Sequence, residues 1–413
     1  MLIKNLFKQP IPRGIIYHEL LYDIKNLFTV LFSNLNNQSK IEFFKDEFSK
    51  LTNSKYCITF AYARTGVYFA LKSQNFEKGS EIIMPPISIK AMVDAVIDLG
   101  LKPVFVDIDI ESYCFDLKLL EQSINEKTKG ILITYLFGMV PNIDQILKIS
   151  KKNKLFVIED FSQCLNGEYK NKKLGTFGDI GIYSSSTTKT LDTYGGGLCI
   201  TDNKDLFLKM SEFEKNLLPA KKLRILKIIF LDLIRNFATS FFIFRFVTYK
   251  FILLFEKFLQ KNLTKYVGER GMDPIQILPN FWFERYTSFQ AMCGSKLLQK
   301  VTSIDTIRIS NVKKIYDSNP SIFSNSCFLE DRRNVFWQFI YLNENIPEAR
   351  IKFLNEKIDT ATSSLILLSN LEYVEKIHTP NAKKLLMNGL FIPSYHKIKD
   401  QNLNRIINLI EKE

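Results

Sequence analysis

The amino-acid sequence predicts an α/β fold in which a mostly parallel sheet forms the larger of two domains. Between residues 56 and 202, short apolar runs alternate with longer segments whose apolar residues recur at helical spacing. This alternation is typical of βαβ units, which bring consecutive strands together in parallel. A chain of 413 residues has room for a second domain. Helical patterns mixed with short strands predict that residues 281–413 form this smaller α+β domain.

Seven apolar runs are expected to be strands of the large sheet, and three periodic segments are expected to be helices. The strands are predicted at 56–61, 81–86, 102–109, 130–138, 154–160, 179–186 and 196–202. The helices are predicted at 63–74, 89–100 and 142–153. Further along, the pattern predicts one long or two consecutive helices over 283–317, a strand over 336–342 and a closing helix over 401–413.

These elements divide the chain into an N-terminal segment (1–45), the large domain (46–205), an insertion or linker (206–280) and the small domain (281–413). The insertion is basic, apolar and rich in Phe. Its most apolar stretch, 238–258, is interrupted by charged residues, which disfavours a membrane span because a spanning helix needs about 20 apolar residues. Two other interpretations compete over 220–260: a buried helical pair at a subunit interface, and a helical pair lying on an anionic membrane.

The composition of the chain limits the kinds of partner that it is expected to bind. The net charge of +13 favours anionic partners, although drift toward Lys-rich composition explains it equally well. We expect no nucleic-acid binding, because no basic patch with interleaved aromatic residues is present. The six cysteines form no C-x-x-C pair, so no metal site is predicted. The N-terminus lacks a secretory pattern, so a cytoplasmic location is expected, with membrane association through 220–260 as the alternative.

Lys189 is the strongest candidate for chemistry. It follows five hydroxyl residues, Ser184 to Thr188, and precedes Gly195, Gly196 and Gly197. Taken alone, such a lysine is most often a solvated surface residue. However, the hydroxyl groups can bind a phosphate, the glycines allow close backbone approach, and a lysine amine can form a Schiff base with a carbonyl cofactor.

Two other strand ends carry matching groups. Asp160 ends the strand 154–160, where a carboxylate can pair with a protonated pyridine nitrogen, or else cap the next helix. Arg64 and Thr65 lie where a strand gives way to a helix, and such a helix start binds phosphate. Active sites of parallel sheets form at the carboxyl ends of strands. Together the three signals predict a site for pyridoxal phosphate (PLP).

The segment 157–202, VIEDFSQCLNGEYKNKKLGTFGDIGIYSSSTTKTLDTYGGGLCITD, resembles the DegT-type nucleotide-sugar aminotransferases, which are fold type I PLP-dependent transferases. The family's ED-x-x-Q motif is present as Glu159, Asp160 and Gln163, and its cofactor lysine falls on Lys189. KPVFVDIDIESYCFD, YLFGMVPNID and the C-terminal FIPSYHKI, which contains His396, are further matches. The resemblance is strong over 40–205 and weaker over 285–413.

The resemblance implies a role for each residue. Lys189 would hold PLP and shuttle a proton, Asp160 would pair with the pyridine nitrogen, and Gln163 would lie near the ring. Arg64, Thr65 and Ser184 would hold the phosphate, whereas Ser88 and His396 would contact the substrate. The implied protein is a homodimer that transfers an amino group, usually from glutamate, to a keto-sugar attached to a nucleotide, for amino-sugar or surface-polysaccharide synthesis.

The sequence also departs from the family pattern. Ile89 stands where an aromatic residue usually stacks on PLP, Phe283 where an Asn is common, and Gly195 where an acid is common; Ser186 replaces a frequent His. These changes leave two alternatives open. One is a PLP-binding sugar dehydratase, a branch in which the lysine is usually replaced. The other is a non-catalytic, membrane-associated relative.

Overall fold

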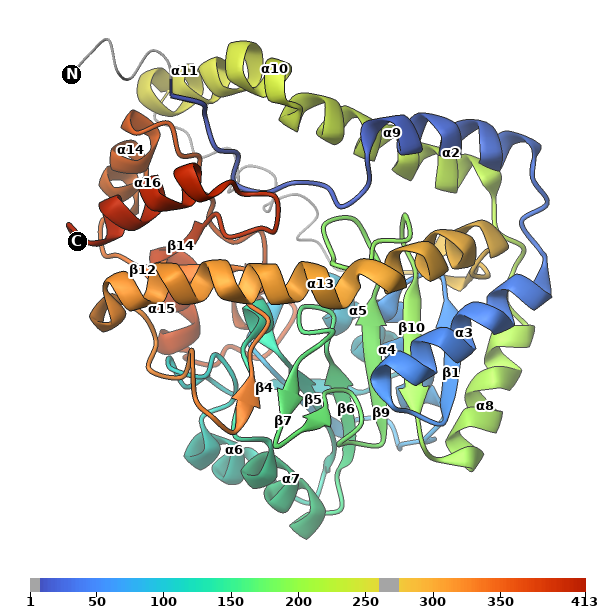
Figure 1. Cartoon of the computed structure of the whole chain (residues 1–413). Coiled ribbons are helices and arrows are strands. Elements are labelled where there is room, and N and C mark those ends of the chain that lie inside the picture. Colours follow the sequence, from blue (N-terminus) through green and yellow to red (C-terminus); the bar gives the residue numbers. More distant parts are fainter. Residues whose placement is uncertain (1–7, 260–274) are drawn as a thin grey trace.

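The computed structural model describes residues 8–259 and 275–413, and a seven-stranded sheet lies at its centre (Figure 1). The strand order is β1-β10-β9-β6-β5-β2-β4. The strands are β1 (Tyr56–Phe60), β2 (Glu81–Met84), β4 (Lys102–Phe105), β5 (Thr128–Thr134), β6 (Phe156–Asp160), β9 (Ile180–Ser184) and β10 (Gly197–Thr201). Strands from β9 to β4 pair in parallel, whereas β10 pairs antiparallel with β9 and β1. The predicted mostly parallel sheet is confirmed, and each strand lies in its predicted run except β5, which begins two residues earlier, at Thr128.

Helices cover both faces of this sheet, because its strands are apolar on both sides. The helices predicted within the large domain are present as α4 (Ala63–Lys72), α5 (Lys90–Asp98) and α7 (Ile143–Lys152). One apolar core lies between the sheet and α4, α5 and α8 (Lys204–Lys215). A second core lies on the other face, against α3 (Gln38–Thr52), α7 and part of α13. Short α6 (Leu117–Ser123) packs beside α7.

The C-terminal part packs around a third core. It begins with α13 (Ser288–Ser318), a single helix of 31 residues, which settles the choice between one long helix and two. The helices α14 (Ile346–Asn355), α15 (Pro380–Asn388) and α16 (Asp400–Ile410) follow, with the antiparallel pair β12 (Phe339–Leu342) and β14 (Gly389–Ile392). The predicted strand over 336–342 and the closing helix are present. Short strands β3 (Ile87–Ser88) and β13 (Ile366–Leu367) join this part to the large domain.

A layer of helices lies across one end of the molecule, seen along the top of Figure 1. It consists of α2 (Leu20–Phe32), α9 (Lys222–Thr239), α10 (Phe241–Ile243), the π-helical turn η2 (Phe244–Thr248) and α11 (Tyr249–Leu259). The predicted insertion is therefore mostly helical up to residue 259; residues 260–274 of it lie outside the described residues. α2 and α3 are not among the predicted elements. Ahead of α2, Ile11 pairs with Ile358, so the N-terminal segment crosses to the C-terminal part.

Candidate active site

Two neighbouring strand ends form the floor of the site. β6 ends at Asp160, which lies opposite Ile182 of β9 and is only 6% exposed. The Asp160 carboxylate accepts a hydrogen bond from the Ser162 N–H at 3.0 Å, and the Ser162 hydroxyl accepts one from the Ser184 N–H at 2.9 Å. Ser162 therefore ties the end of β6 to the end of β9. Burial raises the pKa of Asp160, and the groups of Ser162 and the ammonium of Lys189 oppose that rise.

Lys189 lies in the loop that leaves β9 and returns as β10. Its Nζ is 3.7 Å from the centre of the Trp337 ring, and the Trp337 indole N–H donates to the carbonyl of Thr188 at 2.9 Å. Burial lowers the pKa of Lys189 to about 8, and the Asp160 carboxylate opposes this shift. A lysine with such a pKa carries far more neutral amine near neutral pH than an ordinary lysine. The neutral amine is the form that attacks a carbonyl carbon.

The glycines after Lys189 are required by the tight return of this loop. Gly196 has φ +132°, and a Cβ there would lie 2.4 Å from the Tyr286 ring and 2.5 Å from the Ser185 hydroxyl. Gly195 has φ +95°, and its carbonyl accepts a hydrogen bond from the Gln290 side chain at 2.8 Å. Only glycine fits this approach without strain, so the loop packs directly against the start of α13.

The Arg64–Thr65 turn touches the glycine end of the same loop, because Tyr62 forms a bridge with Gly196. The Arg64 guanidinium lies between two rings, 4.1 Å from the centre of Tyr62 and 4.8 Å from that of Trp282. Burial lowers the pKa of Arg64, and its Nε has no hydrogen-bond partner among the described residues. The Thr65 hydroxyl instead donates to the Trp282 carbonyl at 2.8 Å. Arg64 is thus a partly buried cation whose buried Nε is open to an anionic partner.

Gln163 supports a turn that packs under Trp337, whose ring lies over Lys189. Its side-chain oxygen accepts the N–H of Phe137 at 2.6 Å. The next residue, Gly138, has φ +87°, and a Cβ there would lie 2.5 Å from the Trp337 nitrogen. This close approach lets the Phe137–Gly138 turn pack under Trp337. The described contact of Gln163 is therefore with the backbone of this turn, and its contact with a cofactor ring stays a prediction.

A cavity of about 370 Å³ opens beside the lysine loop, lined by Thr188, Trp337 and Arg308 among others. The buried Arg308 donates to the Val335 carbonyl at 2.7 Å and to the Tyr17 hydroxyl at 2.9 Å. His396 stacks on Tyr17, a lining residue, with ring centres 5.6 Å apart. Burial, with Lys397 and Arg308 nearby, lowers the pKa of His396 to about 4. His396 therefore lies behind the cavity wall as a neutral ring.

The other predicted residues fall at or near these elements. The Ser184 hydroxyl donates to the Ser186 hydroxyl at 3.0 Å, so both stand at the end of β9. Ser88 lies in β3 and pairs with Ile366, shortly after the cavity-lining Thr362 and Ser364. Ile89, where the family usually has an aromatic residue, is the N-cap residue of α5 and is 40% exposed. Their predicted contacts with cofactor and substrate stay predictions.

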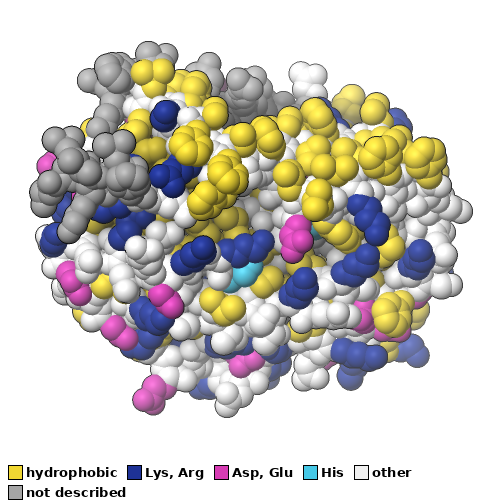
Figure 2. Space-filling model, turned by 45° about the horizontal axis from the view of Figure 1, so that its top comes forward, with side chains coloured by type: hydrophobic (Ala, Val, Ile, Leu, Met, Phe, Trp, Pro, Cys, Tyr) yellow, Lys and Arg dark blue, Asp and Glu magenta, His cyan; other side chains and the backbone are white. Residues whose placement is uncertain are grey.

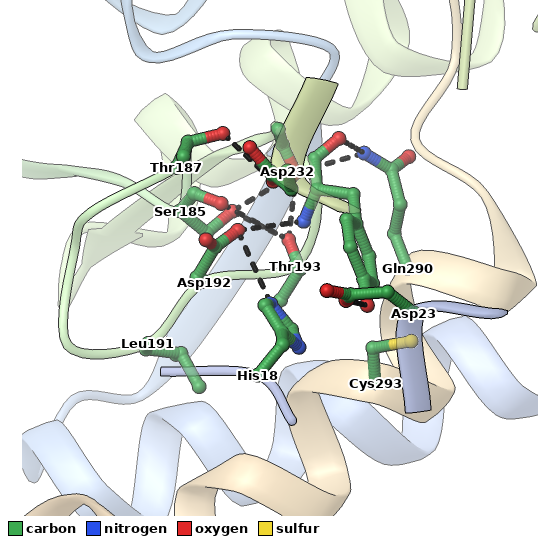
Figure 3. A network of polar contacts seen from close by, with 12 residues as sticks. His18, Asp23, Ser185, Thr187, Leu191, Asp192, Thr193, Asp232, Gln290 and Cys293 are labelled. Carbon is green, nitrogen blue, oxygen red and sulfur yellow. Dashed lines mark hydrogen bonds and ion pairs between the residues drawn. The ribbon is translucent and has the colours of Figure 1, made fainter. Parts of the chain in front are cut away.

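Sequence reasoning missed the polar network that ties the lysine loop to α2 and α9 (Figure 3). Tyr194 donates to the Asp23 carboxylate at 2.5 Å and accepts from the Asn26 amide at 2.9 Å. Thr187 donates to the Asp232 carboxylate at 3.0 Å. His18 lies 3.5 Å from the Asp192 carboxylate; burial lowers its pKa, but Asp192 and two further carboxylates outweigh burial and raise it. The only sequence signal was polar residues within otherwise apolar helices.

A partly buried lysine, a buried carboxylate and a partly buried guanidinium at the ends of adjoining strands define an α/β enzyme of the PLP-binding kind. The sequence model of the DegT/DnrJ/EryC1/StrS aminotransferase family matches residues 23–223, a segment that holds both strand ends and the lysine loop. PLP is the cofactor of these aminotransferases. The family predicted from the motifs, its fold and its cofactor are therefore confirmed.

Two comparisons show how far the similarity extends. A GDP-perosamine synthase of Escherichia coli O157:H7 is 33% identical over 174 residues, which are 42% of this chain and 48% of that protein. The aligned part thus spans about half the length of this relative. The solved Helicobacter pylori PseC, an aminotransferase involved in the biosynthesis of pseudoaminic acid, covers 98% of this chain and 99% of its own, with TM-score 0.72 and 18% identity.

A third comparison bears on the cofactor. Escherichia coli GDP-4-keto-6-deoxy-D-mannose-3-dehydratase, solved with hydrated PLP bound, covers 98% of this chain and 99% of its own, with TM-score 0.69 and 19% identity. The residues of the present chain fit the same group. Arg64 is a partly buried cation with a buried, unpartnered Nε, suited to a phosphate. Asp160 is a buried carboxylate with a raised pKa. A cationic partner, such as a protonated pyridine nitrogen, would lower this pKa.

Proposed function

We propose that this chain is a PLP-dependent aminotransferase that moves an amino group from glutamate to a keto-sugar carried on a nucleotide. The observation that carries the proposal is Lys189, whose pKa burial lowers to about 8, together with the buried carboxylate of Asp160, whose charge opposes that shift. Relatives named GDP-perosamine synthase and spore coat polysaccharide biosynthesis protein support a role in surface polysaccharide synthesis. We further propose that the working enzyme is a homodimer.

Each residue then has a chemical task. When bound, PLP supplies an electron sink for the negative charge that develops at the substrate carbon. Asp160 keeps the pyridine nitrogen protonated, because an ionised carboxylate stabilises an adjacent cation. Arg64 and the hydroxyls of Ser184 and Ser186 hold the phosphate. The Lys189 amine would take a proton from the substrate carbon and later give it back, as a general base and then a general acid.

The presence of a lysine at position 189 favours transamination over sugar dehydration. A group that both removes and returns a proton must have a pKa near the working pH, and the Lys189 amine meets this condition. The cavity beside Thr188 and Trp337 gives the sugar a place to bind. Its lining includes Arg13, Arg235 and Arg308, each of which also pairs with a carboxylate, Asp359, Asp232 and Asp305 respectively. Guanidinium groups bind phosphates well, which suits a sugar attached to a diphosphate.

Borohydride reduction of the PLP-loaded chain, followed by peptide mass spectrometry, tests the proposal. We expect the cofactor on Lys189, and amino transfer from glutamate to a GDP-linked keto-sugar. Lys189→Ala should lose both the trapped cofactor and about 10³-fold or more in kcat. Lys172→Ala, which removes an exposed lysine from a nearby hairpin, should change neither. Cofactor trapped on another lysine, or full activity of Lys189→Ala, would contradict the assignment.

A further inference from the structure

The helical layer carries a large exposed apolar surface. More than half of the exposed large hydrophobic side chains among the described residues lie on α2 and on α9 to α11. We call this surface the outer helical face. Figure 2 shows it as a band of hydrophobic side chains along one side of the molecule. It is formed by Leu21, Ile24, Phe28, Leu31, Phe32, Leu223, Phe230, Leu231, Ile234, Phe237, Phe241, Phe242, Phe246, Val247, Phe251 and Leu254.

The amphipathic pattern of α2 is inverted relative to that of an ordinary surface helix. Its inner side buries the polar residues Asp23 and Asn26, which bond to Tyr194, whereas Phe28 and Phe32 on its outer side are 59% and 86% exposed. A helix on a protein that meets only water shows the opposite arrangement. An exposed apolar surface of this extent indicates a binding site for another molecule or for a membrane.

α9 is apolar on two sides. Its inner residues Ile225 and Ile229 pack in a small core with Tyr194 and Phe289. Its outer residues include Phe230, 54% exposed, and Ile234, 48% exposed. One apolar side is enough to hold the helix on the protein, so the second side needs a partner outside this chain. The family match ends at residue 223, near the start of α9, so this surface lies largely outside the matched segment.

The exposed charge on these helices is of one sign. The acids Asp23 and Asp232 are fully buried, and Glu256 is paired with Arg350 at 2.5 Å. In contrast, Lys25, Lys227 and Lys250 are exposed, as is Arg235, which pairs with Asp232 at 2.8 Å. This combination of apolar rings with flanking lysine and arginine is what an anionic lipid surface binds. Two copies meeting through the same face would bring like charges together.

The helices are placed to lie on a membrane and not to cross it. No single helix among the described residues is long and apolar enough to span a bilayer; the pair Lys222–Thr239 and Phe241–Glu256 passes only when joined across a bend of 58°. One side of α9 is fixed to the protein by Ile225 and Ile229, and its polar Asp232 bonds to Thr187. Only the outer side is therefore free to enter lipid.

We propose that the outer helical face docks this protein on an anionic phospholipid bilayer. The docked surface and the cavity beside Lys189 share α9, because Arg235 and Thr239 line that cavity and Phe237, on the opposite side of the helix, is 52% exposed. Docking would thus bring the mouth of the cavity near the plane of the lipid headgroups. The same helix bonds to the lysine loop through Asp232, so the bilayer contact and the catalytic loop share one element.

Vesicle flotation of the PLP-loaded full chain tests this proposal, and it does not depend on enzymatic activity. We expect the chain to float with vesicles of phosphatidylcholine and phosphatidylglycerol (7:3) and much less with phosphatidylcholine alone. The double variant Phe237→Glu/Phe242→Glu should reduce binding by about tenfold or more, because it places charge in the lipid-facing surface. Phe43→Glu on α3, where Phe43 is 60% exposed, is the matched control and should bind like the parent.

A second variant separates the charge contribution from the apolar one. Lys227→Glu/Lys250→Glu keeps every apolar side chain and should abolish the preference for anionic vesicles. Light scattering of each protein gives its oligomeric state. A parent chain that floats with neither vesicle would overturn the proposal. So would a Phe237→Glu/Phe242→Glu variant that becomes monomeric from a dimeric parent without vesicle binding, since the occupant would then be a second copy.

Discussion

The end of β6 and the outer side of α9 depart from ordinary burial rules in opposite directions. At the end of β6, carboxylates are buried: Glu159 is 0% and Asp160 6% exposed. On α9, apolar rings are exposed: Phe230 is 54% and Phe237 52% exposed. Both arrangements cost free energy unless a partner is present. The strand ends lack ionic partners, which bound PLP would supply to Asp160 and Arg64, whereas the exposed apolar side chains of the helical layer lack an apolar partner.

The comparison predicts that a single substitution near the end of β6 or in the lysine loop has a large effect on stability or on the reaction with PLP. Glu159 accepts the N–H groups of Gly175, Phe177 and Gly178 at 2.8, 2.6 and 2.6 Å. Glu159→Ala would leave these buried donors unpaired, and we expect a loss of about 3–5 kcal/mol in the free energy of unfolding. Urea denaturation measures it. Glu168→Ala, which removes a partly exposed ion pair with Lys173, should cost less than about 1 kcal/mol.

A second prediction concerns the pH dependence of Lys189. Because burial lowers its pKa from 10.5 to about 8, its neutral fraction at pH 7 should exceed that of an ordinary lysine about 300-fold. The rate at which the cofactor-free chain captures PLP should therefore rise with pH and level off above about pH 8. Asp160→Asn removes the carboxylate that opposes this shift, so its midpoint should lie lower still. A midpoint near 10 in stopped-flow absorbance would contradict the burial of Lys189.

A substitution that breaks the hydrogen bonds between the lysine loop and α2 is expected to have an effect of intermediate size. Tyr194→Phe removes a buried hydrogen bond to the Asp23 carboxylate and one from Asn26. We expect a loss of about 1.5–3 kcal/mol, because the acceptor is charged. Hydrogen exchange should show faster opening of α2 and of the lysine loop, with little change in β5 and β6. Equal protection of α2 in both proteins would show that Tyr194 does not couple the two regions.

The strands and the strand-end residues could be predicted from the sequence because their signals are local. Runs such as 154–160 are buried on both faces, and the rule that active sites lie at strand ends then selects Asp160 and Ser184. Trp337 could not be found in this way, since it reaches Lys189 from a distant part of the chain. α2 was missed for a different reason: its buried side is polar, so its pattern does not indicate a helix that packs on a protein.

The smallest effect on stability is expected where the exposed apolar side chains are most numerous. Phe242 is 69% exposed in α10, whose three residues include none that is buried. Phe242→Ser removes little buried area, so the free energy of unfolding should change by less than about 0.5 kcal/mol, and Lys189 should capture PLP as before. Vesicle binding should nevertheless weaken, because the lost ring contributes to the lipid contact. A large loss of stability in urea, with Phe43→Ser as the matched control, would show instead that Phe242 packs within the protein.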